Sequence, residues 1–226
     1  MQRAFFDCLR STPVPFQKAF NRVWFWPTVL ATRALASVCP SCLRLRDEVA
    51  PGIWLGVAPV FLSDVYSLHK DGIRCVVNTC EEWREHEDLY KEKGIREVYL
   101  PTLDHHPPTT EECNQASGIM KETLDAGDKV YVHCKAGRGR STTVVLYHLV
   151  QMSGERPEAV QAAIKKHRGH VVNKWKSEPI QDLWHAMGHE DDGSIAAAAV
   201  ESTTGSERNS SELPPTRLQQ RARKGE

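Results

Sequence analysis

Residues 130–141 read Val-Tyr-Val-His-Cys-Lys-Ala-Gly-Arg-Gly-Arg-Ser, and this stretch decides the fold that we expect. The apolar, largely β-branched run at its start is typical of a buried strand. A cysteine follows, then a short loop with two glycines, and then a serine that opens a helical pattern. The stretch therefore predicts a strand, a tight loop and a helix, with the cysteine where the strand enters the loop.

The residue types of this loop suit the cleavage of phosphate monoesters. A cysteine becomes a nucleophilic thiolate when cations and a helix N-terminus lower its pKa. Inward-pointing backbone N–H groups form a cradle for an anion, and a guanidinium can hold two phosphoryl oxygens at once. We therefore expect Cys134 to be the nucleophile and Arg140 to stabilise the transferred group. The residues expected to bind the phosphate are Lys135, Ala136, Gly137, Arg138, Gly139 and Ser141. A buried structural cysteine is the alternative, and the complete pattern disfavours it.

The spacing His-Cys, five residues, Arg-Ser resembles the cysteine-based protein tyrosine and dual-specificity phosphatase superfamily. Residues 21–30, 55–59 and 77–83 are also similar to segments of the mitochondrial phosphatidylglycerophosphate phosphatase family, so the resemblance runs from about residue 21 to 188. It implies removal of the terminal phosphate from phosphatidylglycerophosphate, on the way to cardiolipin, with no metal or other cofactor. That family has an acidic-acidic-aromatic signature that usually reads Glu-Glu-Tyr-Glu. Here residues 81–84 read Glu-Glu-Trp-Arg, so which contact this segment makes in the active site stays open.

The resemblance directs attention to Asp104, which begins a proline-bearing loop well before the cysteine. The departing alkoxide needs a proton donor, and we expect Asp104 to supply the proton. A solvated loop aspartate is the alternative. His105 and His106 are competing donors, although adjacent loop histidines are more often solvated.

The resemblance implies supporting roles for other residues of the stretch. Ser141 is expected to hydrogen-bond to the cysteine sulfur, and His133 to support the loop and help set the pKa of the thiol. Lys135 and Arg138 add two positive charges to the loop, as in a similar loop of the tumour-suppressor phosphoinositide phosphatase. These charges favour a substrate that carries more than one negative group, such as an anionic phospholipid.

The sequence leaves two other enzymatic functions open, and a third, non-catalytic function is less favoured. A phosphatase of phosphotyrosine and phosphoserine/threonine proteins has the same motif, and so does a phosphoinositide phosphatase. A non-catalytic phosphate-binding module is disfavoured, because Cys134, Asp104 and Arg140 are all present. We expect the mitochondrial inner membrane surface as a partner, although a plastid location is the alternative.

Composition sets limits on the remaining function classes. The 226 residues suit one domain with tails, and basic and acidic side chains are equal in number at 29 each. A nucleic-acid-binding domain is generally basic, so we expect no nucleic acid partner. Seven cysteines without framework spacing favour a reducing compartment. Cys39 and Cys42 are accordingly expected to be ordinary thiols.

Residues 1–46 have the composition of a targeting or membrane-proximal segment, with seven basic residues and one acidic residue. Trp24, Phe25 and Trp26, flanked by Arg22 and Arg33, suit a membrane interface. The alternative is a short helix that packs its tryptophans on the folded domain. Because the cradle itself follows Ala50, we expect deletion of residues 1–46 to leave hydrolysis of a soluble aryl phosphate nearly unchanged.

Strands and helices are expected to alternate through residues 47–189, which predicts an α/β domain of the dual-specificity phosphatase type. Such alternation gives a central, mostly parallel sheet flanked by helices. The expected strands span Ile53–Leu55, Ile73–Asn78, Glu97–Leu100 and Lys129–Val132. The expected helices span residues 63–72, Glu81–Lys93, 109–126, Ser141–Met152, 157–169 and Pro179–Met187. Residues 190–226 lose this pattern and are expected to be disordered.

Overall fold

The computed structural model describes residues 11–39, 43–84 and 86–189, so the tail expected at 190–226 lies outside the described residues. A five-stranded sheet has the order β1-β2-β5-β3-β4. β1 runs antiparallel to β2, whereas β2, β5, β3 and β4 pair in parallel. The strands are β1 (Arg46–Ala50), β2 (Ile53–Val57), β3 (Ile73–Cys80), β4 (Arg96–Thr102) and β5 (Lys129–Cys134). The expected α/β fold is confirmed.

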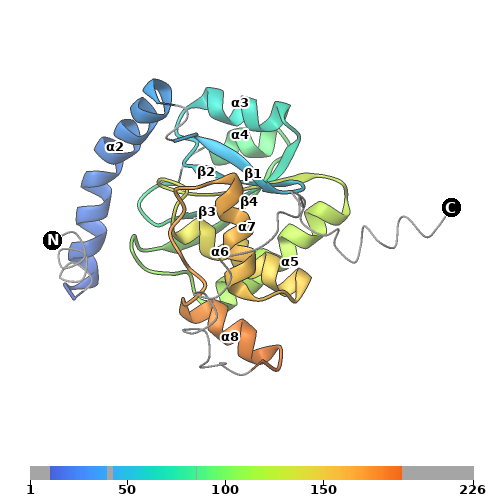
Figure 1. The fold of residues 1–226 in the computed structure, drawn as a ribbon. Helices are drawn as coiled ribbons and strands as arrows, with labels where there is room; N and C mark the ends of the chain where they lie inside the picture. The colour runs from blue at the N-terminus through green and yellow to red at the C-terminus, as the bar shows by residue number, and fades with distance from the viewer. Residues whose placement is uncertain (1–10, 40–42, 85, 190–226) are drawn as a thin grey trace.

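Helices cover both faces of the sheet (Figure 1). On one face lie α5 (Thr110–Asp125), α6 (Arg140–Ser153), α7 (Pro157–His167) and α8 (Glu178–Ala186). On the other lie α3 (Leu62–Lys70) and α4 (Glu87–Glu92). The central strand β5 serves both layers, because alternate side chains of a strand point to opposite faces. Val130 and Val132 pack in the core beneath α5 and α6, while Tyr131 packs with the residues of α3 and α4.

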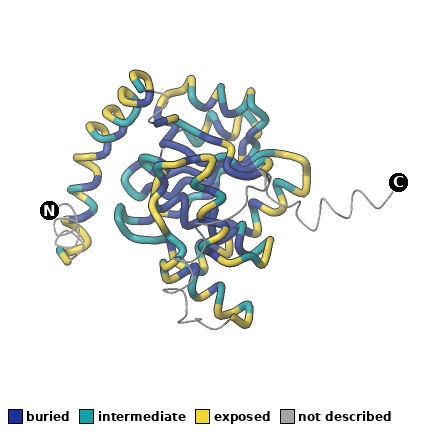
Figure 2. Tube along the Cα trace, in the orientation of Figure 1, coloured by how far each residue is buried: buried dark blue, intermediate teal, exposed yellow. Residues whose placement is uncertain are grey.

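Helix α2 (Val14–Val38) lies alongside this domain, at the carboxyl ends of the strands (Figures 1 and 2). Its buried residues recur at helical spacing and share one face: Gln17, Asn21, Phe25, Val29 and Ala36. Phe25 is 1% exposed, whereas Trp24 and Trp26 are 48% and 42% exposed. The alternative is wrong for the tryptophans, since they face outward and only the phenylalanine packs on the domain. The hypothesis of a membrane interface stays a prediction. No helix among the described residues is long and apolar enough to cross a membrane.

Three local expectations differ from the structure. The helix expected over Glu81–Lys93 is wrong in its first half, because α4 begins only at Glu87. The Asn78 side chain instead holds residues 80–83 as a loop: its Nδ2 donates to the Trp83 carbonyl at 3.2 Å and its Oδ1 accepts from the Cys80 N–H at 2.9 Å. Strand β1 was not expected, because its charged residues hide the apolar pattern of an edge strand. Cys39, expected to be an ordinary thiol, is disulfide-bonded.

Candidate active site

Cys134 is the last residue of β5, and α6 begins six residues later at Arg140. Residues 135–139, here called the phosphate loop, join the two elements. The Ser141 hydroxyl donates to the Cys134 sulfur at 3.3 Å, and the backbone N–H groups of Arg138 and Ser141 also point to it. Burial alone would raise the pKa of the thiol, but Arg140 and these hydrogen bonds outweigh burial and lower the pKa to about 7. A large share of Cys134 is therefore thiolate at neutral pH.

The Arg140 guanidinium is buried and held by two elements. Its Nη1 and Nη2 donate to the two carboxylate oxygens of Glu82, each at 2.7 Å. Nη1 also donates to the carbonyl of Thr102 at 2.8 Å. The remaining donor, Nε, is buried and has no hydrogen-bond partner among the described residues. A buried, unpaired N–H is costly, so this donor marks a place suited to an anionic ligand.

Asp104 lies beside this guanidinium, after the end of β4. Its carboxylate is 3.2 Å from Arg140 Nη2, and the Lys135 ammonium donates to it at 2.6 Å. Burial alone would raise the pKa of Asp104, but Arg140 and Lys135 hold it well below its usual range. The structure thus brings together Cys134, Arg140 and Asp104, and pairs Lys135 with the aspartate.

His133 is fully buried, between the rings of Trp83 and Tyr131 at centroid distances of 5.9 and 5.7 Å. Neither ring nitrogen has a hydrogen-bond partner among the described residues. Burial lowers the pKa of His133 to about 3, so the ring is neutral at physiological pH. His133 accordingly supports the loop by packing. The expectation that it helps to set the pKa of the thiol stays a prediction.

The phosphate loop is fixed against the sheet by a close approach and by a buried arginine. Gly137 has a φ of +63°, and a Cβ on it would lie 2.4 Å from the backbone of Gly56 in β2, so only glycine fits. Arg168 Nε donates to the Gly137 carbonyl at 2.9 Å, and Nη2 donates to the Ala136 carbonyl at 3.4 Å. Asp47 of β1 accepts from Arg168 Nη1 at 2.6 Å. An ion pair from outside the loop therefore holds the loop in shape.

Helix α2 supports the site from the other side. Phe25 stacks on Trp83 with ring centroids 6.0 Å apart and planes 9° apart. Lys18 and Arg22 bind Glu81 at 3.4 and 3.1 Å. Phe25 also belongs to the buried cluster that contains Cys134. The expectation that residues 1–46 are dispensable for chemistry stays a prediction, and these contacts argue against it, because the loop that carries Glu82 rests on this helix.

Two arginines of the N-terminal segment were expected to face lipid. Arg22 instead binds Glu81, and Arg33 binds Asp64 at 2.8 Å with its guanidinium over the ring of Phe61. Both charges are balanced by acidic residues of the domain, although the Arg22 side chain is still 64% exposed. The exposed large hydrophobic side chains of α2 surround it on the outward surface.

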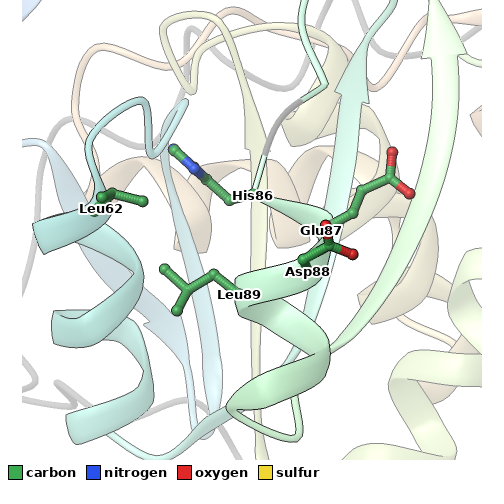
Figure 3. A pocket seen from close by; sticks show the side chains of 5 residues that line it. All are labelled: Leu62, His86, Glu87, Asp88 and Leu89. Atoms are coloured by element: carbon green, nitrogen blue, oxygen red, sulfur yellow. The ribbon is translucent and has the colours of Figure 1, made fainter.

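A separate surface hollow of about 570 Å³ lies between α3 and α4 (Figure 3). Its lining consists of Leu62, His86, Glu87, Asp88 and Leu89. None of these residues belongs to the phosphate loop, and none of the described lining residues carries a thiol or a guanidinium. The candidate active site is therefore the phosphate loop, not this hollow.

Sequence reasoning missed two supporting residues, Glu82 and Arg168. Glu82 lies in the acidic signature, but no local pattern says that its carboxylate turns toward Arg140. Arg168 closes α7 as an ordinary-looking basic residue, and its partner Asp47 is distant in sequence. Both roles arise from tertiary contacts, which periodicity does not report.

A family model described as "Swiss Army Knife protein, DSP-PTPase phosphatase domain" matches residues 47–200. The chain belongs to this family. The DSP-PTPase chain is 37% identical over 163 residues to phosphatidylglycerophosphate phosphatase PTPMT1 of Arabidopsis thaliana. That alignment covers 69% of this chain and 48% of the relative. This chain is also 29% identical to phosphatidylglycerophosphatase and protein-tyrosine phosphatase 1 of Homo sapiens, in an alignment that covers 66% of this chain and 78% of the relative.

Solved structures show the same fold. A crystal structure of PTPMT1 in complex with PI(5)P has a TM-score of 0.56 and 26% identity, covering 62% of this chain and 93% of the other. Human DUSP28 has a TM-score of 0.55 at 21% identity, which supports the fold alone. The DSP-PTPase chain spans about half the length of the first curated relative that it matches. The expected resemblance to the dual-specificity superfamily is confirmed.

Proposed function

We propose that this protein is a phosphoric monoester hydrolase that works through a cysteinyl-phosphate, with residues 47–189 as the catalytic domain. The observation that carries the proposal is the buried, unpaired Nε of Arg140 beside a thiol whose pKa is about 7. The guanidinium is already oriented by Glu82, so its remaining N–H edge suits two phosphoryl oxygens. A nucleophile and an oriented anion clamp in one buried cradle support phosphoryl transfer.

In the first step, the Cys134 thiolate attacks phosphorus and forms the S–P bond as the P–O bond to the alcohol breaks. The phosphoryl oxygens are held by Arg140 and by the loop N–H groups, which already point inward to the sulfur. The hydrogen bond from Ser141 favours the thiolate, so it also stabilises the sulfur when it departs in the second step.

The departing oxygen takes its proton from Asp104, and in the second step the same carboxylate accepts a proton from the water that hydrolyses the S–P bond. The products are the alcohol, inorganic phosphate and the restored thiolate. Asp104 is ionised in the unliganded site because of Arg140 and Lys135. A bound phosphate brings negative charge next to the carboxylate and engages Arg140, and both effects raise the pKa of Asp104 toward the protonated form.

The substrate that we propose is phosphatidylglycerophosphate, which would yield phosphatidylglycerol for cardiolipin synthesis. Two of the similar relatives carry the name phosphatidylglycerophosphate phosphatase. The mitochondrial inner membrane surface is the location that we propose on this basis. A phosphoprotein is the second candidate, because the human relative is also named a protein-tyrosine phosphatase.

The outer face of α2 supports residence at a membrane. Phe16, Phe20 and Trp24 follow one another at i, i+4 spacing, with neighbouring ring centroids 6.4 and 6.1 Å apart. The helix contains no acidic residue. Its exposed large apolar side chains are Val14, Phe16, Val23, Trp24, Trp26, Leu30, Leu35 and Val38. Aromatic residues on such a face suit the interface between lipid headgroups and acyl chains.

The deciding experiment measures phosphate release by the full chain from phosphatidylglycerophosphate, PI(5)P and a phosphotyrosine peptide, each presented at equal concentration. The proposal expects the highest kcat/KM for phosphatidylglycerophosphate. Cys134→Ser serves as the control, and it should abolish all three activities while circular dichroism stays unchanged, because a serine hydroxyl does not ionise here. A preference for the phosphopeptide would replace the lipid substrate, and activity of Cys134→Ser would remove the proposed nucleophile.

A further inference from the structure

Arg168 is the largest fully buried side chain in the described part of the chain, and it directly follows α7. A buried guanidinium is stable only when its charge is paired and its N–H groups are hydrogen-bonded. Nη1 donates to the Asp47 carboxylate of β1 at 2.6 Å and to the Arg44 carbonyl at 3.1 Å. The other hydrogen bonds of this guanidinium go to the phosphate loop, so its burial is offset by β1 and by that loop together.

The two hydrogen bonds to the phosphate loop go to consecutive carbonyls. Nε of Arg168 donates to the Gly137 carbonyl at 2.9 Å, and Nη2 makes a longer contact of 3.4 Å with the Ala136 carbonyl. In a trans peptide group the C=O and the N–H point in opposite directions, and every peptide bond among the described residues is trans. The N–H groups that follow these carbonyls therefore point away from Arg168. The second of them, the Arg138 N–H, is hydrogen-bonded to the Cys134 sulfur.

One peptide group thus joins a buried cation to the reactive sulfur. Its carbonyl end accepts from Arg168, and its N–H end donates to Cys134. Hydrogen bonds in a chain polarise one another at low dielectric, and a charged donor forms the stronger bonds. The bond from Arg168 therefore makes the Arg138 N–H a stronger donor, both to the thiolate and to a phosphoryl oxygen held in the loop.

Asp47 fixes the guanidinium and also balances its charge. Because the two charges lie side by side, the pair is electrically neutral, and its direct field at the sulfur is small. The effect on the sulfur is instead carried by the orientation and polarisation of the peptide group. Asp47 has a second partner, the Arg44 side chain, which is 62% exposed and lies 2.5 Å from it. Arg44 also donates to the His167 carbonyl at 2.8 Å, so it serves as a charged neighbour for comparison.

We propose that Arg168, held by Asp47, is a positioning residue that aims the Arg138 N–H into the phosphate loop and strengthens it as a donor. The inference rests on the proposed function, since it takes Cys134 as the nucleophile, and it adds a support for the thiolate that lies outside the loop. The test leaves unchanged the other titratable or charged groups around Cys134 and Arg168, which are Cys80, Glu82, Asp104, Tyr131, His133, Arg140 and His170.

The test measures the pH dependence of alkylation by iodoacetamide, followed by mass spectrometry on the peptide that contains Cys134. The thiolate is the reactive form, so the midpoint reports the pKa of the thiol whether or not the protein hydrolyses a phosphate. In the double variant Asp47→Leu with Arg168→Met, the midpoint should rise by about one pH unit, the size expected for weakening a hydrogen bond to a charged group. Alkylation at pH 6 should then slow by about tenfold.

Two further variants separate positioning from stability. The double variant keeps the net charge and leaves no buried charge unpaired, a replacement that is often neutral for folding, and circular dichroism checks its fold. Arg168→Lys keeps a charge opposite Asp47 but lacks the guanidinium fork, so its midpoint should also rise, by less. Arg44→Gln is the matched control, because it removes the exposed partner of Asp47 and should leave the midpoint at the wild-type value.

The outcomes decide between this inference and its alternatives. A wild-type midpoint in the folded double variant would overturn the role of Arg168. If that variant does not fold, a wild-type midpoint in Arg168→Lys would overturn it instead. An equal shift in Arg44→Gln would assign the effect to surface charge and also overturn it. A midpoint that shifts as expected in a protein without phosphatase activity would support this inference and remove only the proposed function.

Discussion

Glu82 and Arg140 form a two-point ion pair in which both oxygen–nitrogen distances are 2.7 Å and neither side chain reaches solvent beyond 2%. The pair joins the loop after β3 to the first residue of α6. Because the carboxylate occupies Nη1 and Nη2, the orientation of the guanidinium is set before any phosphate arrives. Such preorganisation is the feature that makes electrostatic stabilisation of a transition state effective.

Replacing Glu82 by Gln should therefore impair the site through the arginine. We expect kcat/KM for para-nitrophenyl phosphate to fall by about 10²-fold, since small displacements of catalytic groups have effects of this size. Stability should fall by about 3–5 kcal/mol, because the variant leaves a buried guanidinium without its countercharge. Steady-state kinetics and denaturant unfolding measure the two effects. Glu122→Gln is the control, as it removes only an exposed ion pair with Arg96, away from the phosphate loop. An equal loss in both variants would contradict the role of Glu82.

Asp104→Asn should slow alkyl phosphates far more than activated aryl phosphates. An asparagine cannot donate the proton that an alkoxide needs, whereas a nitrophenolate leaves without one. We expect a loss of about 10²–10⁴-fold in kcat on glycerol phosphate and a much smaller loss on para-nitrophenyl phosphate. Equal losses on the two substrates would assign the proton to another group, with His105 the first to test.

The hydrogen bond from the Ser141 hydroxyl should have a measurable effect on the pKa of Cys134. The thiolate is the reactive form, so alkylation by iodoacetamide should rise with pH around a midpoint of about 7 in the wild type. Ser141→Ala removes a hydrogen bond that lowers the pKa, so the midpoint should move to higher pH and alkylation at pH 6 should slow. Thr142→Val is the control, because that hydroxyl has no partner among the described residues. A midpoint that does not move in Ser141→Ala would show that the contact with the sulfur does not stabilise the thiolate.

Substitutions on the outward face of α2 should affect membrane binding without affecting hydrolysis. Phe16→Ala combined with Trp24→Ala should weaken binding to cardiolipin-rich vesicles by about tenfold or more, as expected for the loss of buried aromatic area. Hydrolysis of para-nitrophenyl phosphate should not change, because both side chains point away from the domain. Vesicle co-sedimentation measures the binding, and Tyr66→Ala on α3 is an exposed aromatic control. Unchanged binding by the double variant would place the membrane contact elsewhere.

The sequence predicted those parts of the molecule whose signal is local. The strand, loop and helix around Cys134 follow from a continuous pattern, and Asp104 follows from resemblance. The first half of the helix expected over Glu81–Lys93 failed because the Asn78 side chain and the buried Glu82 and Trp83 determine that loop. Helical propensity is a weak preference that such tertiary contacts override. The role of Arg168 depends on Asp47, 121 residues away, and no window of the sequence contains both.

The stacking of Phe25 on Trp83 has a consequence for anyone who prepares this protein. The family match begins at residue 47, which invites an expression fragment that starts there. Such a fragment lacks Phe25, whose ring covers Trp83, and it lacks Lys18 and Arg22, which bind Glu81. Glu82, which lies between Glu81 and Trp83, is the residue that orients Arg140. Poor activity of that fragment would reflect a displaced arginine, not the absence of a phosphatase. A protein fragment used to assay the chemistry should therefore begin upstream of Val14, so that it contains the whole of α2.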